Sequence, residues 1–299
     1  MKAMDFLDTL FFDPDITIRD MHKGLTNQNF LLEMNQETYV LRIPRADSEH
    51  IVNRHHETMA LEAVRDADID VETIYYDEAS GYKVTRYLPD ARTYRECEDP
   101  CKLERTAALM KRFHSLQKRV DADFEPIRRL QGYRNRLRQP LYDLTPYEDA
   151  IQAVYHLNNP RILCHNDWVD GNILFTKDKT YLIDYEYAAN NDPLFDVMSF
   201  LSENQIEDPA LRERFYAVYF DEMNATVRRQ LDIWENFQNL LWCCWAMMMW
   251  ESRHESIYRA IARDKYEALK RKKSEHLIPL CQSFSTYAVI CCFAYVEAG

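Results

Sequence analysis

The sequence has no hydrophobic run long enough to cross a bilayer. Its longest apolar stretches, Leu240–Trp250 and Ala288–Val296, are well short of the about 20 residues that a membrane-spanning helix requires. The N-terminal segment Met1–Asp20 mixes acidic and apolar residues, so it lacks the basic start and apolar core of a signal peptide. We therefore expect a cytoplasmic protein that is not inserted in a membrane.

Zinc-ligand spacing is also missing. The chain has eight cysteines, but no Cys-x-x-Cys pair occurs among them. A reducing compartment argues against a disulfide framework, and the adjacent Cys291 and Cys292 are most simply explained as core thiols. With 46% hydrophobic residues among 299, the chain can bury a sizeable core without covalent crosslinks.

Positive charge is scarce. The chain has 37 Lys and Arg against 49 Asp and Glu, which gives a formal net charge of -12. Proteins that bind a polyphosphate backbone need a basic surface, so we do not expect nucleic acid as a partner. An acidic surface suits a small cationic substrate, although many cytosolic proteins are equally acidic. The oligomeric state is left open by these numbers.

The first third of the chain alternates between apolar and polar residues, as β-strands do. Strands are predicted at Phe30–Met34, Thr38–Ile43, Glu72–Asp77 and Tyr82–Tyr87. Between the two pairs, Ser48–Arg65 has apolar residues at four-residue spacing, which predicts a helix. Gly81 is expected to form the turn of the second pair. These elements predict a small β-rich lobe over residues 1–88.

Pro89 and Asp90 interrupt this pattern, and the chain beyond them is mainly helical. Helices are predicted at Cys101–Gln117, Ile127–Arg138, Tyr147–His156 and in several places after residue 190. The exception is Arg161–Asp184, where three short apolar runs bounded by polar turns predict buried strands around a loop. We therefore predict an α+β protein whose second lobe, residues 89–299, is mainly helical.

The loop inside this exception reads His165-Asn166-Asp167-Trp168-Val169-Asp170-Gly171-Asn172. Its His-x-Asp-x-x-x-x-Asn spacing is that of a phosphotransferase catalytic loop. In such a loop the aspartate faces the incoming hydroxyl while the asparagine faces a metal on the phosphates. Asp184, at the end of an apolar run, could add the carboxylate that Mg²⁺ prefers beside phosphate oxygens.

Five blocks of sequence, in order along the chain, resemble the choline/ethanolamine kinase family, and especially its LicA-type bacterial choline kinases. The blocks are Lys23–Asn29, Tyr39–Pro44, His165–Leu174, Leu182–Ala188 and Asn191–Asp196. This family is related in fold to aminoglycoside phosphotransferases and protein kinases. The resemblance therefore implies a protein-kinase-like fold of two lobes with ATP in the cleft between them.

The resemblance also implies roles for single residues of the catalytic lobe. Asp167 matches the family's catalytic aspartate, and Asn172 and Asp184 match its magnesium ligands. His165 is expected to hold the loop by hydrogen bonding, because the family uses it structurally. Asp196 is interpreted as a buried scaffold carboxylate.

Nucleotide binding is implied for residues of the first lobe. The residues concerned are Asn27, Asn29, Arg42, Glu57, Arg86 and Leu88. Arg42 stands where protein kinases keep a phosphate-binding lysine, and its planar fork can hold two phosphate oxygens. Glu57 is its expected ion-pair partner, although other acids lie nearby. The segment Gly24–Asn29 would cover the phosphates, despite its single glycine, and the linker Arg86–Leu88 would contact the adenine.

The acceptor alcohol should be recognised by aromatic residues. Trp242 and Trp245 lie three apart, hence on one helical face, and resemble the family's C-terminal tryptophan pair. Indole faces suit a quaternary ammonium group, whereas the primary ammonium of ethanolamine prefers carboxylates or carbonyls. Core packing is the competing explanation for both tryptophans. Tyr185 and Glu186 resemble positions near the substrate, and Glu186 could attract a cation.

These patterns lead to choline kinase activity with ATP and Mg²⁺ as the leading hypothesis. An ethanolamine kinase or an aminoglycoside phosphotransferase is the alternative within the same class. A catalytically silent pseudokinase is disfavoured by the intact Asp167, Asn172 and Asp184. A metal-dependent hydrolase is ranked below these, because no histidine cluster for a second metal occurs near the loop.

Overall fold

The computed structural model describes residues 16–21, 27–34, 36–45 and 53–273. The chain divides into two compact units. The first contains residues 1–124 and 159–228, and the second contains residues 125–158 and 229–299. Each unit is described by itself below. The boundary predicted after residue 88 is a different division, between lobes of the kinase type, and stays a prediction.

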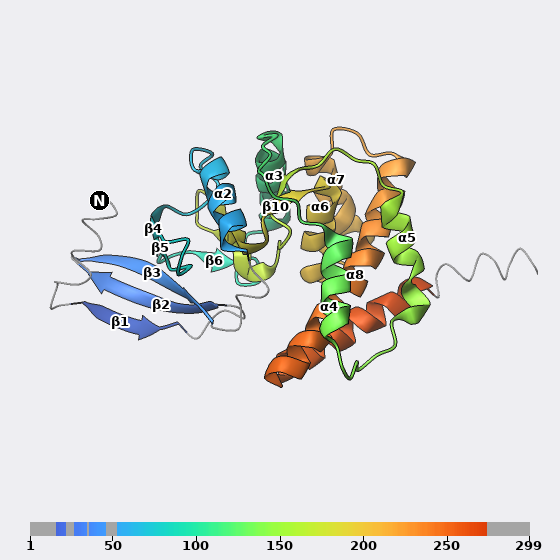
Figure 1. The fold of residues 1–299 in the computed structure, drawn as a ribbon. Coiled ribbons are helices and arrows are strands. Elements are labelled where there is room, and N and C mark those ends of the chain that lie inside the picture. The colour runs from blue at the N-terminus through green and yellow to red at the C-terminus, as the bar shows by residue number, and fades with distance from the viewer. Residues whose placement is uncertain (1–15, 22–26, 35, 46–52, 274–299) are drawn as a thin grey trace, which may run out of the picture. The chain divides into compact units, whose positions relative to one another are not determined.

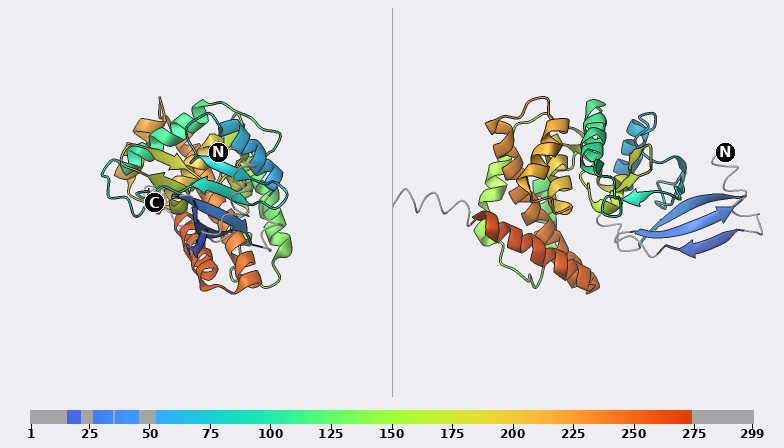
Figure 2. Two further views of the ribbon diagram at one scale, coloured as in Figure 1. Left: turned by 90° about the vertical axis from the view of Figure 1, so that its left-hand side faces the viewer. Right: turned by 180° about the vertical axis from the view of Figure 1, so that it is seen from behind.

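An antiparallel five-stranded sheet forms the N-terminal part of the first unit, in the order β1-β2-β3-β5-β4 (Figure 1; Figure 2 shows it from two further sides). Its strands are β1 Thr17–Asp20, β2 Asn27–Met34, β3 Glu37–Pro44, β4 Thr73–Tyr76 and β5 Lys83–Arg86. All four predicted strands are confirmed. The edge strand β1 was not predicted, because its four residues are all exposed and show no apolar alternation.

The two faces of this sheet differ in character. Leu32, Met34, Tyr39 and Val84 form a buried hydrophobic cluster on one face. Successive side chains of a strand point to opposite faces, so Arg42, three positions after Tyr39 in β3, lies on the face opposite to this cluster. The sheet therefore separates an apolar packing surface from a surface that carries charge.

Helix α2, Arg54–Val64, lies beside β4 and β5 on the charged side of the sheet (Figure 1). It begins at Arg54 because the extended Asn53 accepts hydrogen bonds through its side chain from the backbone N–H groups of His55 and His56. The predicted helix was longer, and its residues 48–52 lie outside the described residues. Glu57 is buried in the first turn of α2.

Short strands and helices build the rest of the first unit. They are β6 Arg92–Thr93, α3 Lys102–Ser115, β7 Ile162–Cys164, β8 Ile173–Phe175, β9 Thr180–Leu182, β10 Ala189–Asn191, α6 Pro193–Glu203 and α7 Pro209–Tyr219. The three predicted strands β7, β8 and β9 are confirmed. They pair as β10-β7 and β6-β8-β9, which leaves the connections between them as ordered loops. β6 and β10 were missed because they have only two and three residues.

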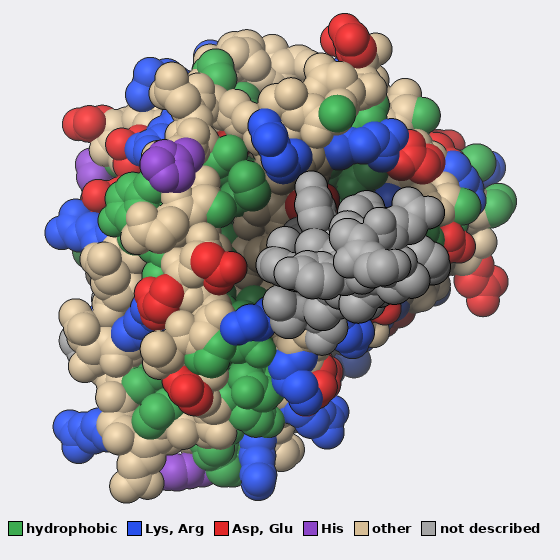
Figure 3. Space-filling view, turned by 90° about the vertical axis from the view of Figure 1, so that its right-hand side faces the viewer, with side chains coloured by type: hydrophobic (Ala, Val, Ile, Leu, Met, Phe, Trp, Pro, Cys, Tyr) green, Lys and Arg blue, Asp and Glu red, His purple; other side chains and the backbone are tan. Residues whose placement is uncertain are grey.

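Helices dominate the second unit. It contains α4 Pro126–Arg136, the 3₁₀ turn η2 Thr145–Tyr147, α5 Asp149–Tyr155, most of α8 Ala225–Arg253 and a further helical stretch over 256–273. Residues 237–249 of α8 are all buried, as expected for a core helix. Figure 3 shows a face of the molecule on which basic, acidic and apolar side chains are interspersed.

No helix among the described residues is both long and apolar enough to span a bilayer. The apolar stretch Leu240–Trp250 belongs to the buried part of α8. Ala288–Val296 lies outside the described residues, as do Cys291 and Cys292. The remaining cysteines that the structure describes are unpaired thiols, in agreement with the prediction of no disulfide framework in this part of the chain.

Replacing Gly81 by alanine should destabilise the protein by about 1–2 kcal/mol, because φ is +74° there and a left-handed conformation disfavours a side chain. A Cβ atom would also lie 2.7 Å from Cγ of Pro44. The matched control is Gly132→Ala in helix α4, where a Cβ would meet nothing within 4 Å and should stabilise the helix by about 1 kcal/mol. Thermal unfolding measures both; equal midpoints would contradict the assigned turn.

Candidate active site

Asp196 anchors the predicted catalytic loop. It lies in the first turn of α6 and its side chain is completely buried. Its Oδ2 accepts a hydrogen bond of 2.8 Å from the backbone N–H of His165, and its Oδ1 accepts one of 2.7 Å from that of Asn166. Two backbone donors of the loop are thus fixed by one carboxylate. The interpretation of Asp196 as a buried scaffold carboxylate is confirmed.

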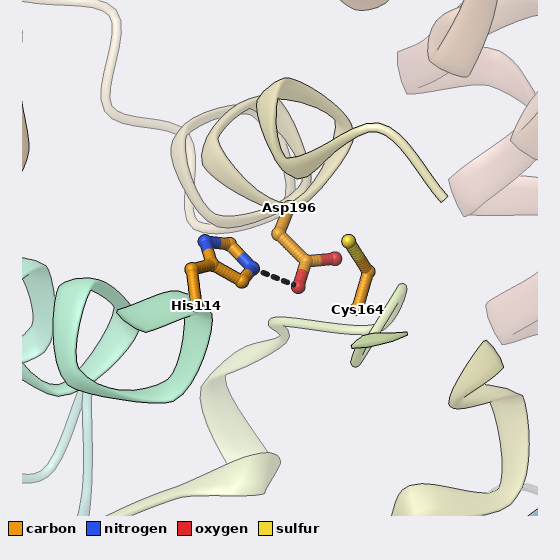
Figure 4. A group of neighbouring side chains, drawn as sticks. All are labelled: His114, Cys164 and Asp196. Carbon is orange, nitrogen blue, oxygen red and sulfur yellow. Dashed lines mark hydrogen bonds and ion pairs between the residues drawn. The ribbon is translucent and has the colours of Figure 1, made fainter. Parts of the chain in front are cut away.

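His114, Cys164 and Asp196 are the one group of His, Cys, Asp or Glu side chains in the described part of the chain that could converge on a metal ion (Figure 4). Their donor atoms are already engaged. Nε2 of His114 donates to Oδ2 of Asp196 at 3.0 Å, and the same carboxylate holds the loop. Burial raises the pKa of the Cys164 thiol well above its ordinary value, so no thiolate is offered. This group therefore belongs to the hydrogen-bonded core that holds the loop.

His165 supports the loop from the opposite side. Its Nε2 donates to the backbone carbonyl of Ile183 at 3.0 Å, since a carbonyl can only accept. Burial lowers the pKa of His165, which keeps the imidazole neutral at pH 7. Its ring packs against Trp168 and Tyr185 at centroid distances of 5.9 and 5.0 Å. These contacts tie the catalytic loop to the segment around Asp184.

Asp167 and Asn172 face each other across the loop. Nδ2 of Asn172 donates to Oδ2 of Asp167 at 2.9 Å and to its backbone carbonyl at 3.0 Å. The amide oxygen of Asn172 is therefore turned away from Asp167. Burial raises the pKa of Asp167 to about 8, and the negative charges of Asp184 and Glu203 act in the same direction. A cation placed among these groups would restore the ionised form.

Asp184 is held in a left-handed conformation, with φ of 69°. Such a backbone is unfavourable for a residue with a side chain, so the surroundings must enforce it. The N–H of Ile183 donates to the carbonyl of Asn172 at 3.0 Å, which brings the two predicted metal ligands into neighbouring segments. Oδ1 of Asp184 accepts from Arg42 at 3.0 Å.

Arg42 links three elements of the first unit. Its guanidinium contacts Glu57 of α2 at 2.7 Å and Asp184 at 3.0 Å, from its own place in β3. Arg42 and Glu57 are 8% and 1% exposed, so the expected ion pair is present and almost dry. Burial acts to raise the pKa of Glu57, but the charge of Arg42 outweighs it and holds that pKa below the ordinary value.

Glu186 lies two residues after Asp184 and is buried. Its Oε2 accepts a hydrogen bond of 2.9 Å from Nδ2 of Asn27, the first residue of β2. Burial and the charge of Asp184 raise the pKa of Glu186. Tyr185, between the two acids, is completely buried against His165 and Phe113. Its predicted contact with substrate stays a prediction. In this structure its ring is enclosed by these neighbouring side chains.

The other predicted nucleotide residues lie around the sheet. Asn29 is half-buried in β2, directly opposite Arg42 in the strand register. Arg86 forms ion pairs with Glu72 at 2.7 Å and Glu37 at 3.2 Å. Residues 24–26 of the predicted phosphate-covering segment lie outside the described residues.

A cavity of about 770 Å³ in the first unit is lined by Arg86 and Leu88 together with residues of α2, β4 and β9. Neither Asp167 nor Asp184 is among its lining residues. The linker predicted to contact adenine therefore borders this cavity, together with residues of α2. Its adenine contact stays a prediction.

Trp242 and Trp245 lie in the second unit, within the buried part of α8. Their rings meet edge to face, with centroids 6.1 Å apart and planes at 88°. Trp245 makes a similar contact with Tyr258, at 5.6 Å and 79°. Both tryptophans are 8% exposed. The pair forms an aromatic corner that is nearly desolvated, a geometry compatible with either core packing or a binding site for an organic cation.

The cluster in the first unit fits a hard divalent cation. Asp184 and Asn172 supply carboxylate and amide oxygens, which are the donors that Mg²⁺ prefers. The hydrogen bond from Nδ2 of Asn172 to Asp167 fixes the amide so that its oxygen is left for a metal. The negative charge of Asp184 adds to burial in raising the pKa of both Asp167 and Glu186, and such an ion would offset that charge.

Sequence reasoning did not find two further buried residues of this cluster. Lys83 on β5 and Asp70 in the loop after α2 form an ion pair of 3.3 Å. Their residue types alone suggested solvated positions. The register of the β3 and β5 strands, with Lys83 opposite Arg42, is the signal that could have revealed Lys83.

Comparison with known proteins identifies the family. The phosphotransferase enzyme family matches residues 17–234. Protein LicA of Haemophilus influenzae is 30% identical over 241 residues, which cover 74% of this chain and 70% of that protein. A probable ethanolamine kinase of Arabidopsis thaliana is 21% identical over 285 residues, covering 81% of this chain and 74% of the relative.

Solved structures of similar fold include the choline kinase LicA from Streptococcus pneumoniae, with a TM-score of 0.78 and 21% identity over 92% of this chain and 100% of that chain. The GDP complex of wild-type aminoglycoside 2'-phosphotransferase-IIIa has a TM-score of 0.62 and 13% identity over 92% of this chain and 100% of that chain. These likenesses establish the kinase-like α+β fold, with its small sheet and mostly helical C-terminal part.

The fold and the matched region define the class, a phosphotransferase of the kinase-like type. The chain belongs to the phosphotransferase enzyme family and, within it, to the LicA-type proteins of the choline/ethanolamine kinase family. It is accordingly an enzyme that phosphorylates the alcohol group of a small molecule.

Replacing Asp196 by asparagine should destabilise the protein by about 2–3 kcal/mol and lower turnover. The amide nitrogen would face a donor, because the carboxylate oxygens together accept from His165, Asn166 and His114. Asp178→Asn, at an exposed position between β8 and β9, is the matched control. Thermal unfolding and steady-state turnover check the prediction, and wild-type values for both would contradict the anchoring role.

Proposed function

We propose that this enzyme is an ATP-dependent choline kinase, which transfers the γ-phosphate of Mg-ATP to the hydroxyl of choline and yields phosphocholine. The observation that carries the proposal is the arrangement of Asp167 beside Asn172 with Asp184 bound to Arg42. Asp167 would serve as the base and Asn172 and Asp184 as oxygen ligands beside the buried Arg42, in a chain related to LicA. Phosphoryl transfer requires this combination.

Nucleotide binding is proposed for the charged face of the sheet. The Arg42 guanidinium, oriented by Glu57, would hold phosphate oxygens through its planar fork. Asn27 and Asn29, at the start of β2, would border the phosphates, and the linker with Arg86 and Leu88 the adenine. A neighbouring LicA structure was solved in complex with AMP, with a TM-score of 0.75, which supports an adenine nucleotide.

Asn172 and Asp184 would hold the magnesium ion. When bound, the ion neutralises the β- and γ-phosphates and so favours attack by the alcohol. Because Oδ1 of Asp184 is already engaged by Arg42, this carboxylate can bind a cation and orient the guanidinium at once. His165 and Asp196 keep the loop rigid, so little rearrangement is required of these ligands.

Asp167 would receive the alcohol. One of its oxygens is occupied by the amide of Asn172, which leaves the other to accept a hydrogen bond from the hydroxyl. The ionised form is needed for this, and a cation held by Asn172 and Asp184 would lower the raised pKa of Asp167. Alignment of the hydroxyl for in-line attack is then the main contribution to catalysis.

Choline is proposed as the acceptor because of the aromatic corner in the second unit. A trimethylammonium group has no N–H donor and loses little when it leaves water for indole faces. The nearly dry environment of Trp242 and Trp245 would strengthen that attraction. Ethanolamine is the second candidate, since one relative is named a probable ethanolamine kinase. Its primary ammonium would require acceptors such as the carboxylate of Glu186.

Asp167→Asn should reduce kcat by about 10²- to 10⁴-fold, since the amide cannot take the alcohol proton. The variant keeps the side-chain shape and can still accept from Asn172, so Mg-ATP should bind as in the wild type. Steady-state kinetics and calorimetric titration measure the two effects. Asp178→Asn serves as the control of equal charge change. Near-normal turnover in Asp167→Asn would overturn the assignment.

The neutral isostere 3,3-dimethyl-1-butanol, which replaces the nitrogen of choline by carbon, should be phosphorylated with a kcat/KM about tenfold or more below that of choline. Trp242→Leu should raise the KM for choline by a similar factor and leave the KM for the isostere unchanged. The KM of Trp242→Phe for choline should lie between those of the wild type and Trp242→Leu. Thermal unfolding identifies any variant that loses its core. Equal kcat/KM for choline and the isostere would contradict a cation-binding corner.

A further inference from the structure

A second buried cation lies beside Arg42. Lys83, in β5, is only 4% exposed, although lysine is rarely buried without a reason. The strand register places it directly opposite Arg42 of β3. Directly paired residues of antiparallel strands project to the same face, so both cations lie on the charged side of the sheet.

Lys83 contacts two segments that are distant in sequence. Its Nζ lies 3.3 Å from Oδ2 of Asp70, in the loop that follows α2. Asp70 is fixed in turn, because its Oδ1 accepts from the N–H of Val71 at 2.7 Å. The same ammonium lies 5.9 Å from the ring centroid of Tyr185, within the range of a cation–π interaction.

These contacts connect Lys83 to both halves of the proposed nucleotide and metal site. Tyr185 follows Asp184, whose left-handed backbone has to be enforced by its neighbours. The positive charge of Lys83 also favours the ionised form of Glu57, the partner of Arg42. If a nucleotide phosphate binds the Arg42 guanidinium, Lys83 still provides a positive charge near the buried carboxylate of Glu57.

We propose that Lys83, paired with Asp70, is a positioning residue that fixes the Arg42–Glu57 pair and the Asp184 segment for binding of the magnesium nucleotide. The inference rests on the proposed function, in which Arg42 and Asp184 bind that ligand. It assigns to the pair a role that acts through Glu57 and Tyr185, without contact to the substrates.

The competing explanation is that the pair only contributes to stability. A buried ion pair can often be replaced by neutral residues of similar volume without loss of stability, whereas removal of one partner leaves an unpaired charge. The double variant Lys83→Met/Asp70→Asn removes both charges, keeps the approximate volumes and preserves an oxygen for the N–H of Val71. It therefore separates positioning from stability.

The chain offers a matched control pair. Lys179 and Asp68 form an ion pair of the same residue types in the same unit, but Asp68 is largely exposed. Surface pairs of this kind contribute little. The double variant Lys179→Met/Asp68→Asn changes the composition identically, and it should bind nucleotide as the wild type does.

The experiment is calorimetric titration of Mg-ADP, which needs no acceptor, with thermal unfolding of each variant. We expect Lys83→Met/Asp70→Asn to unfold near the wild-type temperature, but to bind Mg-ADP about tenfold more weakly and to require more Mg²⁺ for half-maximal binding. The control pair should change neither value. Unchanged affinity in a folded double variant would overturn the inference.

Two further results keep the test decisive. If the double variant does not fold, Lys83→Met is titrated instead, since Asp70, whose pKa burial raises, can take up a proton and become neutral. If neither folds while Lys83→Arg folds and binds Mg-ADP normally, the pair serves stability only and the inference fails. Failure of the proposed function is a separate result, because it would appear as absent Mg-ADP binding in the wild-type protein.

Discussion

The Arg42 guanidinium is a buried cation whose charge is shared between two carboxylates from different elements, Glu57 of α2 and Asp184 of the segment after β9. Removing one partner of such a pair typically costs about 3–5 kcal/mol, because the other charge stays buried. The sheet, α2 and the segment after β9 are therefore held in a fixed relation within the first unit. Any phosphate that reaches Arg42 meets a cation already oriented.

The catalytic loop is fixed in a complementary way. Asp196 accepts two backbone N–H groups of the loop, and His165 closes it against Ile183, so Asp167 and Asn172 are presented on a rigid frame. Burial raises the pKa of Asp167, and the negative charges of Asp184 and Glu203 add to this effect. The proposed magnesium ion, held by Asn172 and Asp184, would offset this negative charge.

Much of the first unit could be predicted from sequence, because strand alternation and the spacing of the His165–Asn172 loop are local signals. The strand β1 and the pairs Asn27–Glu186 and Lys83–Asp70 could not be predicted. The members of these pairs are 159 and 13 residues apart, and only the three-dimensional arrangement determines which polar side chains meet. The same limit applies to the tryptophan pair, whose spacing is equally consistent with core packing.

The most direct measurement is product analysis by mass spectrometry after incubation of the purified enzyme with Mg-ATP and choline, beside ethanolamine and a reaction without acceptor. The account predicts phosphocholine in amounts equal to the ADP released, much less phosphoethanolamine, and little ADP when no acceptor is present. Absence of phosphocholine, or preferential formation of phosphoethanolamine, would contradict choline as the acceptor; absence of any phosphorylated alcohol would contradict kinase activity toward both candidates.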